Sequence, residues 1–189
     1  MSDREYKLIF TGSMGAGKTT AIAAVSEVAP VRTEMQNTDH AHHVKETTTT
    51  GLDYGVVTLP GGEVLRLFGT PGQVRFQFMW EILGKGALGV VVLADNSSED
   101  PVGDVLEYAR AFADVIDGSR AVVGVGRMDV HPVPTLEDYD AALRGIGVRV
   151  PVVSTDVRQR EQVLTLLDIL FYQIDAASEF SGAALQEVP

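Results

Sequence analysis

The sequence predicts an α/β fold: a six-stranded, mostly parallel sheet with helices on both faces, in three layers. Strand-like and helix-like segments alternate along the chain, which is typical of a parallel sheet covered by helices. Residues 87–94 and 121–125 are continuous apolar runs, as expected of strands buried on both faces. The 189 residues are enough for one domain, which we expect to cover 1–175, with a flexible tail at 176–189.

Six segments have the apolar or β-branched content of strands: 6–11, 51–59, 64–68, 87–94, 121–125 and 150–153. Five others are alanine-rich or amphipathic, as helices are: 18–28, 77–85, 104–116, 135–143 and 161–174. Pro-Gly-Gly-Glu at 60–63 joins the second and third strands into a hairpin. Thr135 and Asp138 have the spacing of a capping box at the start of the fourth helix. Residues 29–50 are polar and aperiodic, which is typical of a functional loop.

Residues 12–19 read Gly-Ser-Met-Gly-Ala-Gly-Lys-Thr and match the pattern G-x-x-x-x-G-K-[ST] at every position. This pattern describes a P-loop, in which backbone N–H groups surround a β-phosphate, the lysine reaches the β and γ oxygens, and the hydroxyl binds Mg²⁺. A strand before it and a helix after it are the context that this chemistry requires. We therefore expect phosphates to be bound by Gly12, Ser13, Met14, Gly15, Ala16, Gly17, Lys18, Thr19 and Thr20, with Thr19 as a metal ligand.

Composition excludes several classes of function. The chain has 15 basic and 26 acidic residues and a net charge of −11, which opposes binding to nucleic acid or to anionic lipid. It has no cysteine, which excludes disulfides and zinc–thiolate sites. The polar N-terminus and the lack of a run of ~18 apolar residues predict no signal peptide, no integral membrane segment and a cytoplasmic location.

The segment Gly-Thr-Pro-Gly-Gln-Val-Arg-Phe at 69–76 resembles the Asp-x-x-Gly-Gln motif of small Ras-like GTPases, with glycine in place of the aspartate. This variant is similar to the bacterial MglA-like GTPases and the actinobacterial conservon GTP-binding proteins, and the resemblance covers about residues 6–174. It implies a Ras-like G domain that binds Mg²⁺ and GTP and hydrolyses GTP to GDP, slowly without a partner. It further implies a roadblock- or longin-type regulatory partner and a role in bacterial signalling or polarity.

The resemblance also assigns roles to single residues. Gly72 would donate its N–H to the γ-phosphate and Gln73 would orient the attacking water, with Lys18 completing the catalytic set. The carboxylate missing at Gly69 could be replaced by another, such as Asp95.

Residues 47–54 resemble the end of the first switch loop of Ras-like proteins, which makes Thr49 the sensor of Mg²⁺ and γ-phosphate. Thr48 and Thr50 are close alternatives. Arg32, Arg66 and Arg75 are candidates for an arginine that stabilises the transferring phosphoryl group.

Two further segments concern the base. Gly126-Arg127-Met128-Asp129 stands where these GTPases have Asn-Lys-x-Asp, so Asp129 fits the carboxylate that reads guanine and Arg127 could stack on the base. Gly126 departs from the asparagine, which leaves the choice between GTP and ATP open. Ser154, Thr155 and Asp156 follow the last strand where Ser-Ala-Lys is expected, and only Ser154 matches. A backbone N–H near Thr155 could reach the guanine oxygen.

Other interpretations follow from the same residues. Gly69 and Gly126 favour a nucleotide-dependent scaffold that does not hydrolyse, or that binds ATP. A P-loop kinase for a small molecule would need an arginine-rich lid, and the sequence contains no such segment.

Overall fold

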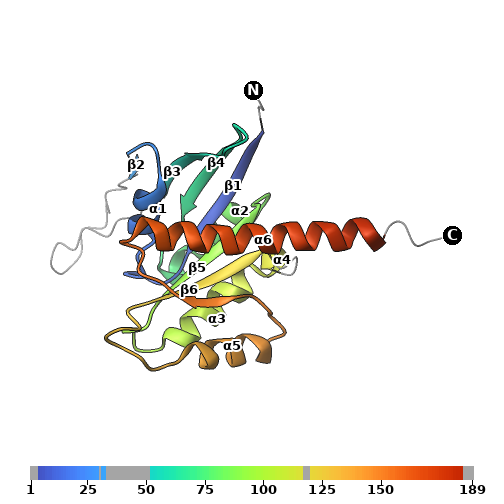
Figure 1. Ribbon diagram of the computed structural model, residues 1–189. Helices are drawn as coiled ribbons and strands as arrows, with labels where there is room; N and C mark the ends of the chain where they lie inside the picture. The colour runs from blue at the N-terminus through green and yellow to red at the C-terminus, as the bar shows by residue number, and fades with distance from the viewer. Residues whose placement is uncertain (1–3, 30, 33–51, 117–119, 185–189) are drawn as a thin grey trace.

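A mostly parallel sheet forms the centre of this computed structural model, which describes residues 4–29, 31–32, 52–116 and 120–184. Within these residues the sheet has seven strands in the order β2-β3-β4-β1-β5-β6-β7 (Figure 1). They are β1 (Glu5–Thr11), β2 (Val31–Arg32), β3 (Asp53–Thr58), β4 (Val64–Gly69), β5 (Gly89–Asp95), β6 (Ala121–Gly126) and β7 (Val152–Ser154). β3 is antiparallel to β4, and β2 is antiparallel to β3, whereas the other neighbouring strands are parallel.

Helices cover both faces of the sheet, so the predicted three-layer α/β arrangement is confirmed (Figure 1). The helices are α1 (Lys18–Val25), α2 (Gln77–Gly84), α3 (Pro101–Ala111), α4 (Ala113–Ile116), α5 (Leu136–Gly145) and α6 (Arg160–Ala184), with a 3₁₀ turn, η1 (Val74–Phe76), before α2. α1 and α6 pack on one face, and α2, α3, α4 and α5 pack on the other.

Two apolar cores lie on the two sides of the central strands. Leu8 and Phe10 belong to the core under α1 and α6, whereas Ile9 belongs to the core under α3 and α5. β5 divides in the same way, with Val91 on the first side and Val90 on the second. Side chains alternate along a strand, so a strand covered on both faces must be apolar at every position. Each such side chain contributes roughly 1.5–3 kcal/mol to folding.

The structure differs from the prediction in the number of strands, in the helix expected at 104–116 and in the C-terminal tail. The two-residue edge strand β2 adds to the six predicted strands. The helix expected at 104–116 begins at Pro101, because Asp100 caps it through the N–H of Gly103, and it is interrupted at Phe112 between α3 and α4.

The tail predicted from residue 176 is helical through Ala184, because α6 continues across the alanine-rich end of the described chain. Figure 1 shows the last turns of α6 extending beyond the sheet. No helix among the described residues is both long enough and apolar enough to cross a bilayer.

The parallel strands place one edge of the sheet in position to hold a ligand. The segments that follow β1, β4, β5, β6 and β7 all leave from the carboxyl ends of their strands. Ligands of open α/β sheets bind at this edge. The P-loop, the 69–73 segment and the loops at 95, 126–130 and 154–159 therefore meet there.

Candidate functional site

Glycines shape the P-loop. Gly12, Gly15 and Gly17 have φ values of 138°, 90° and 94°, which residues with a Cβ rarely adopt. At Gly12 a Cβ would also lie 2.1 Å from the carbonyl oxygen of Leu93 in β5. The loop therefore leaves β1 in backbone contact with β5, and it turns into α1 through Gly17 as the N-cap residue. The N–H groups at the start of α1 thus face the same space as the loop, as an anion site requires.

Lys18 is folded back onto the loop that precedes it. Its Nζ donates to the carbonyl oxygens of Gly12 and Ser13, both at 2.7 Å, and the residue is only 8% exposed. Burial lowers the pKa of Lys18 from 10.5 to about 8, against the opposing effect of the nearby Asp53 carboxylate. The amine is therefore held at the mouth of the loop, where phosphate oxygens can replace the two carbonyls as its partners.

Thr19, the next residue, contacts a carboxylate from β3. Its Oγ1 donates to Oδ2 of Asp53 at 2.5 Å, and Asp53 is buried. A hydroxyl and a carboxylate, which are the oxygen ligands that Mg²⁺ prefers, thus lie together beside the P-loop.

The 69–73 segment, which contains Gly72 and Gln73, packs directly against the P-loop. The N–H of Thr70 donates to the carbonyl of Phe10 at 2.9 Å, and the Thr70 and Thr11 hydroxyls are 2.8 Å apart. A Cβ on Gly72 would lie 2.6 Å from the backbone nitrogen of Met14 and 2.9 Å from Nζ of Lys18. Glycine is therefore required at position 72 for the two backbones to come this close.

Gln73 is turned toward the P-loop. Its Nε2 lies 3.9 Å from Sδ of Met14, whose side chain is exposed. A thioether sulfur is a weak acceptor, so this contact holds the amide only loosely.

Two aromatic residues that the sequence did not single out hold this segment. Trp80 in α2 donates from Nε1 to the carbonyl of Pro71 at 2.8 Å, and the Tyr108 hydroxyl in α3 donates to the carbonyl of Gly72 at 3.1 Å. The two rings pack with their centroids 4.5 Å apart. Burial, with the nearby carboxylates of Asp104 and Glu107, raises the pKa of Tyr108 well above its usual value, so its hydroxyl stays a donor. In the sequence, Trp80 and Tyr108 stand among apolar residues, and this pattern indicates only that they lie in the core.

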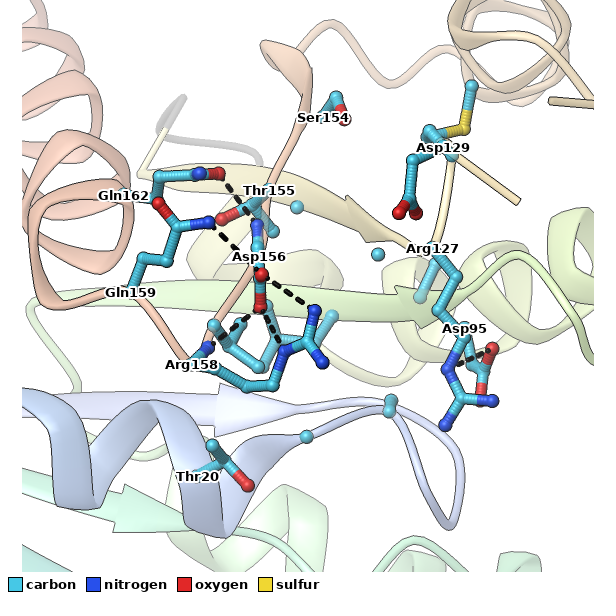
Figure 2. Close-up of a pocket in the computed structure, with 18 of the residues that line it drawn as sticks. Thr20, Asp95, Arg127, Asp129, Ser154, Thr155, Asp156, Arg158, Gln159 and Gln162 are labelled. Atoms are coloured by element: carbon cyan, nitrogen blue, oxygen red, sulfur yellow. Dashed lines mark hydrogen bonds and ion pairs between the residues drawn. The ribbon is translucent and has the colours of Figure 1, made fainter. Parts of the chain in front are cut away.

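A cavity of about 610 Å³ continues from the P-loop toward the ends of β6 and β7 (Figure 2). This volume suits a nucleoside-sized ligand. The predicted site residues that line it are Gly15, Ala16, Gly17, Thr20, Arg127, Asp129, Ser154 and Thr155. The residues predicted to bind the base (Arg127, Asp129, Ser154 and Thr155) therefore line the same cavity as residues 15–17 of the P-loop.

Arg127 and Asp95 form part of the cavity wall as an ion pair. Nε of Arg127 lies 3.3 Å from Oδ1 of Asp95, and Ser97 bonds to both side chains. Oδ1 of Asp95 is thus engaged by Arg127 and Ser97, whereas the carboxylate that contacts Thr19 is that of Asp53. Arg127 has a φ of 63°, an uncommon value for a residue with a side chain.

Asp129 and Asp156 lie on different sides of the drawn cavity (Figure 2). Asp129 is exposed. The Asp156 carboxylate accepts from Nε and Nη2 of Arg158, both at 2.8 Å, and from Gln159, and these bonds hold its pKa far below the usual range. Of the two carboxylates, Asp129 is therefore the better placed to accept from a base.

The backbone donor expected near Thr155 is already engaged. The N–H of Thr155 donates to the carbonyl of Val125 at 2.9 Å, and that of Asp156 donates to Oε1 of Gln162 at 2.7 Å. The first belongs to the sheet edge, so a ligand could reach only the second, by displacing Gln162. Ser154 is exposed, whereas Thr155 is buried, and its Oγ1 has no hydrogen-bond partner among the described residues.

Three predicted residues stay outside this geometry. Thr49, with its alternatives Thr48 and Thr50, lies outside the described residues. Nε of Arg66 bonds to Glu5, at the end of β1 away from the P-loop, which argues against Arg66 as the catalytic arginine. The Arg75 guanidinium lies over the Phe76 ring, 4.8 Å from its centroid.

The fold and this site together define a three-layer α/β P-loop protein of the nucleotide-binding, GTPase-like class. Residues 30–142, more than half of the chain, match the profile of a family described as conserved hypothetical ATP binding protein, and the chain belongs to this family. The match includes the 69–73 segment and Asp129 and begins after the P-loop.

Among similar proteins, the uncharacterized protein MJ1339 of Methanocaldococcus jannaschii is 27% identical over 143 residues, which cover 74% of this chain and 81% of that protein. The Ras-related protein Rab-8A of Gallus gallus is 27% identical over 111 residues, and Rab-8B of Homo sapiens is 26% identical over the same length. These matches cover 57% of this chain and 48% of each Rab protein, so the chain spans about half the length of these Rab relatives.

We expect Gly12→Ala to destabilise the protein far more than Gly62→Ala. Both glycines have positive φ, but a Cβ at Gly62 would meet nothing within 4 Å. Gly62→Ala should therefore cost only the backbone strain of about 1–2 kcal/mol. Gly12→Ala should cost about 3 kcal/mol more, because the Leu93 carbonyl must move. The free energy of unfolding of each variant is measured by urea denaturation. Equal losses of stability in the two variants would contradict the close approach of Gly12 to the Leu93 carbonyl.

We expect Lys18 to titrate near its pKa of about 8 in the nucleotide-free protein and at higher pH once nucleotide is bound. Phosphate charge favours the ammonium form, so above pH 8 binding takes up a proton and affinity falls as the pH rises. Lysine ¹³Cε chemical shifts, followed from about pH 6 to 11, report this midpoint, and the reference is the value of about 10.4 for lysine in model peptides. A Lys18 midpoint near the ordinary value in the free protein would contradict the burial argument.

Proposed function

We propose that this protein is a Mg²⁺-dependent GTPase that acts as a two-state switch. The observation that carries the proposal is the packing of Gly72 against the P-loop, where its Cβ position is 2.9 Å from Nζ of Lys18. This places Gln73 next to the residues that would hold the γ-phosphate. A simple phosphate-binding loop needs no such second segment, whereas a hydrolytic switch does.

In this proposal the phosphates take the place of the carbonyl oxygens that now bind Lys18. The P-loop N–H groups and the amine would hold the β- and γ-phosphates, and Gly72 would donate its N–H to the γ-phosphate. Mg²⁺, when bound, neutralises charge on the β- and γ-oxygens, and Thr19 would supply a hydroxyl ligand, with Thr49 as the further ligand that the sequence suggests. Gln73 would leave its weak contact with Met14 to orient the attacking water.

Guanine is the base that Asp129 fits best, because a carboxylate accepts from the N1–H and N2–H₂ donors of guanine and adenine has no matching pair. A second candidate, binding of ATP, is favoured by Gly126, which removes an amide from the base side, and by the family's description as ATP-binding. A non-hydrolysing scaffold would share this nucleotide site.

On the basis of the Gly-Thr-Pro-Gly-Gln segment, we also propose that this protein functions as the MglA-like and conservon GTPases do. That assignment carries with it the predicted roadblock- or longin-type regulator and a role in bacterial signalling or polarity.

Competition for the site separates the two bases. In the presence of Mg²⁺, GTP should displace a fluorescent GDP analogue at concentrations at least about tenfold lower than ATP does, and Asp129→Asn should remove this preference. Asp168→Asn, an exposed carboxylate on α6, is the matched control and should behave as the wild type. Lys18→Ala should abolish binding of both nucleotides. A preference for ATP in the wild type would establish the second candidate.

Gln73→Leu tests hydrolysis. We expect the rate of phosphate release from GTP to fall at least about tenfold while GDP affinity is retained, because the side chain acts on water and not on the nucleotide. Gln77→Leu, at the exposed start of α2, is the control for the loss of an amide nearby. An unchanged rate in Gln73→Leu would overturn the role of Gln73, and a wild type that binds but releases no phosphate would favour the scaffold.

A further inference from the structure

The strand that ends at Gly69 lacks a carboxylate at the edge of the nucleotide site, but the neighbouring strand supplies one. Asp53, the first residue of β3, is paired directly with Gly69 across the antiparallel β3–β4 ladder. Side chains at directly paired positions lie on the same face of a sheet, so each occupies space that the other could use.

The space beside Gly69 is filled by Asp53. A Cβ built on Gly69 would lie 3.0 Å from Cβ and 3.1 Å from Oδ2 of Asp53, and 3.1 Å from Cδ1 of Ile22 in α1. An aspartate at position 69 would therefore crowd the Asp53 side chain, which would have to shift by a few tenths of an ångström to admit it. Glycine at 69 leaves this space to Asp53.

The Asp53 carboxylate is directed at the P-loop side of this space. It is 93% buried, since only 7% of the residue is exposed, and Oδ2 accepts from the Thr19 hydroxyl at 2.5 Å. The charge of Asp53 also favours the ammonium form of Lys18. A buried carboxylate is costly unless it is paired, and among the described residues the Thr19 hydroxyl compensates for it only in part.

We propose that Asp53 and Thr19 hold the Mg²⁺ ion of the bound nucleotide, an inference that rests on the proposed function. Asp53 then takes the place of the carboxylate that is absent at position 69. The protein then contributes a carboxylate and a hydroxyl, and the phosphates and water complete the oxygen shell that Mg²⁺ requires. Asp53 acts directly or through a bound water.

This assignment also accounts for the short Thr19–Asp53 contact. The hydrogen bond between the Thr19 hydroxyl and the Asp53 carboxylate already holds the two oxygens close together. With Mg²⁺ bound, both oxygens would serve as its ligands, and the Thr19 hydroxyl would donate its proton to another acceptor.

The test exchanges the carboxylate between the two paired positions. Asp53→Asn keeps the shape and an oxygen acceptor for Thr19 but removes the charge. The double variant Asp53→Gly/Gly69→Asp moves the carboxylate onto β4 and at the same time avoids crowding between side chains at positions 53 and 69. Asp168→Asn on the exposed face of α6 is the matched control.

Mg²⁺ is titrated calorimetrically into each variant loaded with GDP, or with ADP if competition favours adenine. The affinity of the same nucleotide is measured in EDTA. We expect Asp53→Asn to weaken Mg²⁺ binding at least about tenfold, with little change in the EDTA affinity, and the double variant to recover most of the loss. Asp168→Asn should match the wild type.

Unchanged Mg²⁺ affinity in Asp53→Asn, in a protein that still binds nucleotide, would overturn the assignment and leave the proposed function intact. A lower unfolding midpoint without a change in Mg²⁺ affinity would overturn it as well, since Asp53 would then be structural. Failure of the wild type to bind any nucleotide would refute the proposed function itself.

Discussion

The constraint on which the site depends is the close approach of three backbone segments, which two glycines permit. Gly12 lets the P-loop pass against the Leu93 carbonyl of β5, and Gly72 lets the segment after β4 lie against the nitrogen of Met14. The P-loop is thereby enclosed between two neighbours, and the directions of its N–H groups are set before a ligand arrives. Preorganisation of this kind reduces the ordering that binding requires.

The apolar cores and the site are held by some of the same side chains. Trp80 and Tyr108 belong to the core under α3, yet their polar atoms bond to the carbonyls of Pro71 and Gly72. On the base side, buried Asn96 donates to the carbonyls of His131 and Pro134 and accepts from Tyr139, and so fixes the loop that carries Asp129. A change in core packing would therefore move both the segment beside the P-loop and the loop that carries Asp129.

What the sequence predicted well was local, and what it missed depended on contacts between distant segments. The P-loop and the central strands are contiguous patterns, so their places could be predicted. Asp53 was missed as a partner of Thr19 although a signal existed: the tight turn between Leu59 and Glu63 sets the hairpin register, and counting outward from it pairs Asp53 with Gly69. The Asp95–Arg127 pair had no comparable local signal, because it joins the ends of β5 and β6.

The two halves of the cavity differ in how firmly they are built. The phosphate side is made of backbone groups, a buried lysine and glycines with positive φ, two of which have no room for a Cβ, so it can change little. The base side is made of the Asp95–Arg127 and Asp156–Arg158 pairs, in which both arginine side chains are mostly exposed, at 56% and 78%. Ion pairs with exposed partners contribute little to stability, so a bound ligand can rearrange them at little cost. In the proposed function, the choice of base would then depend on Asp129, the carboxylate that is not paired in this way, and Gly126 leaves no amide beside it to assist.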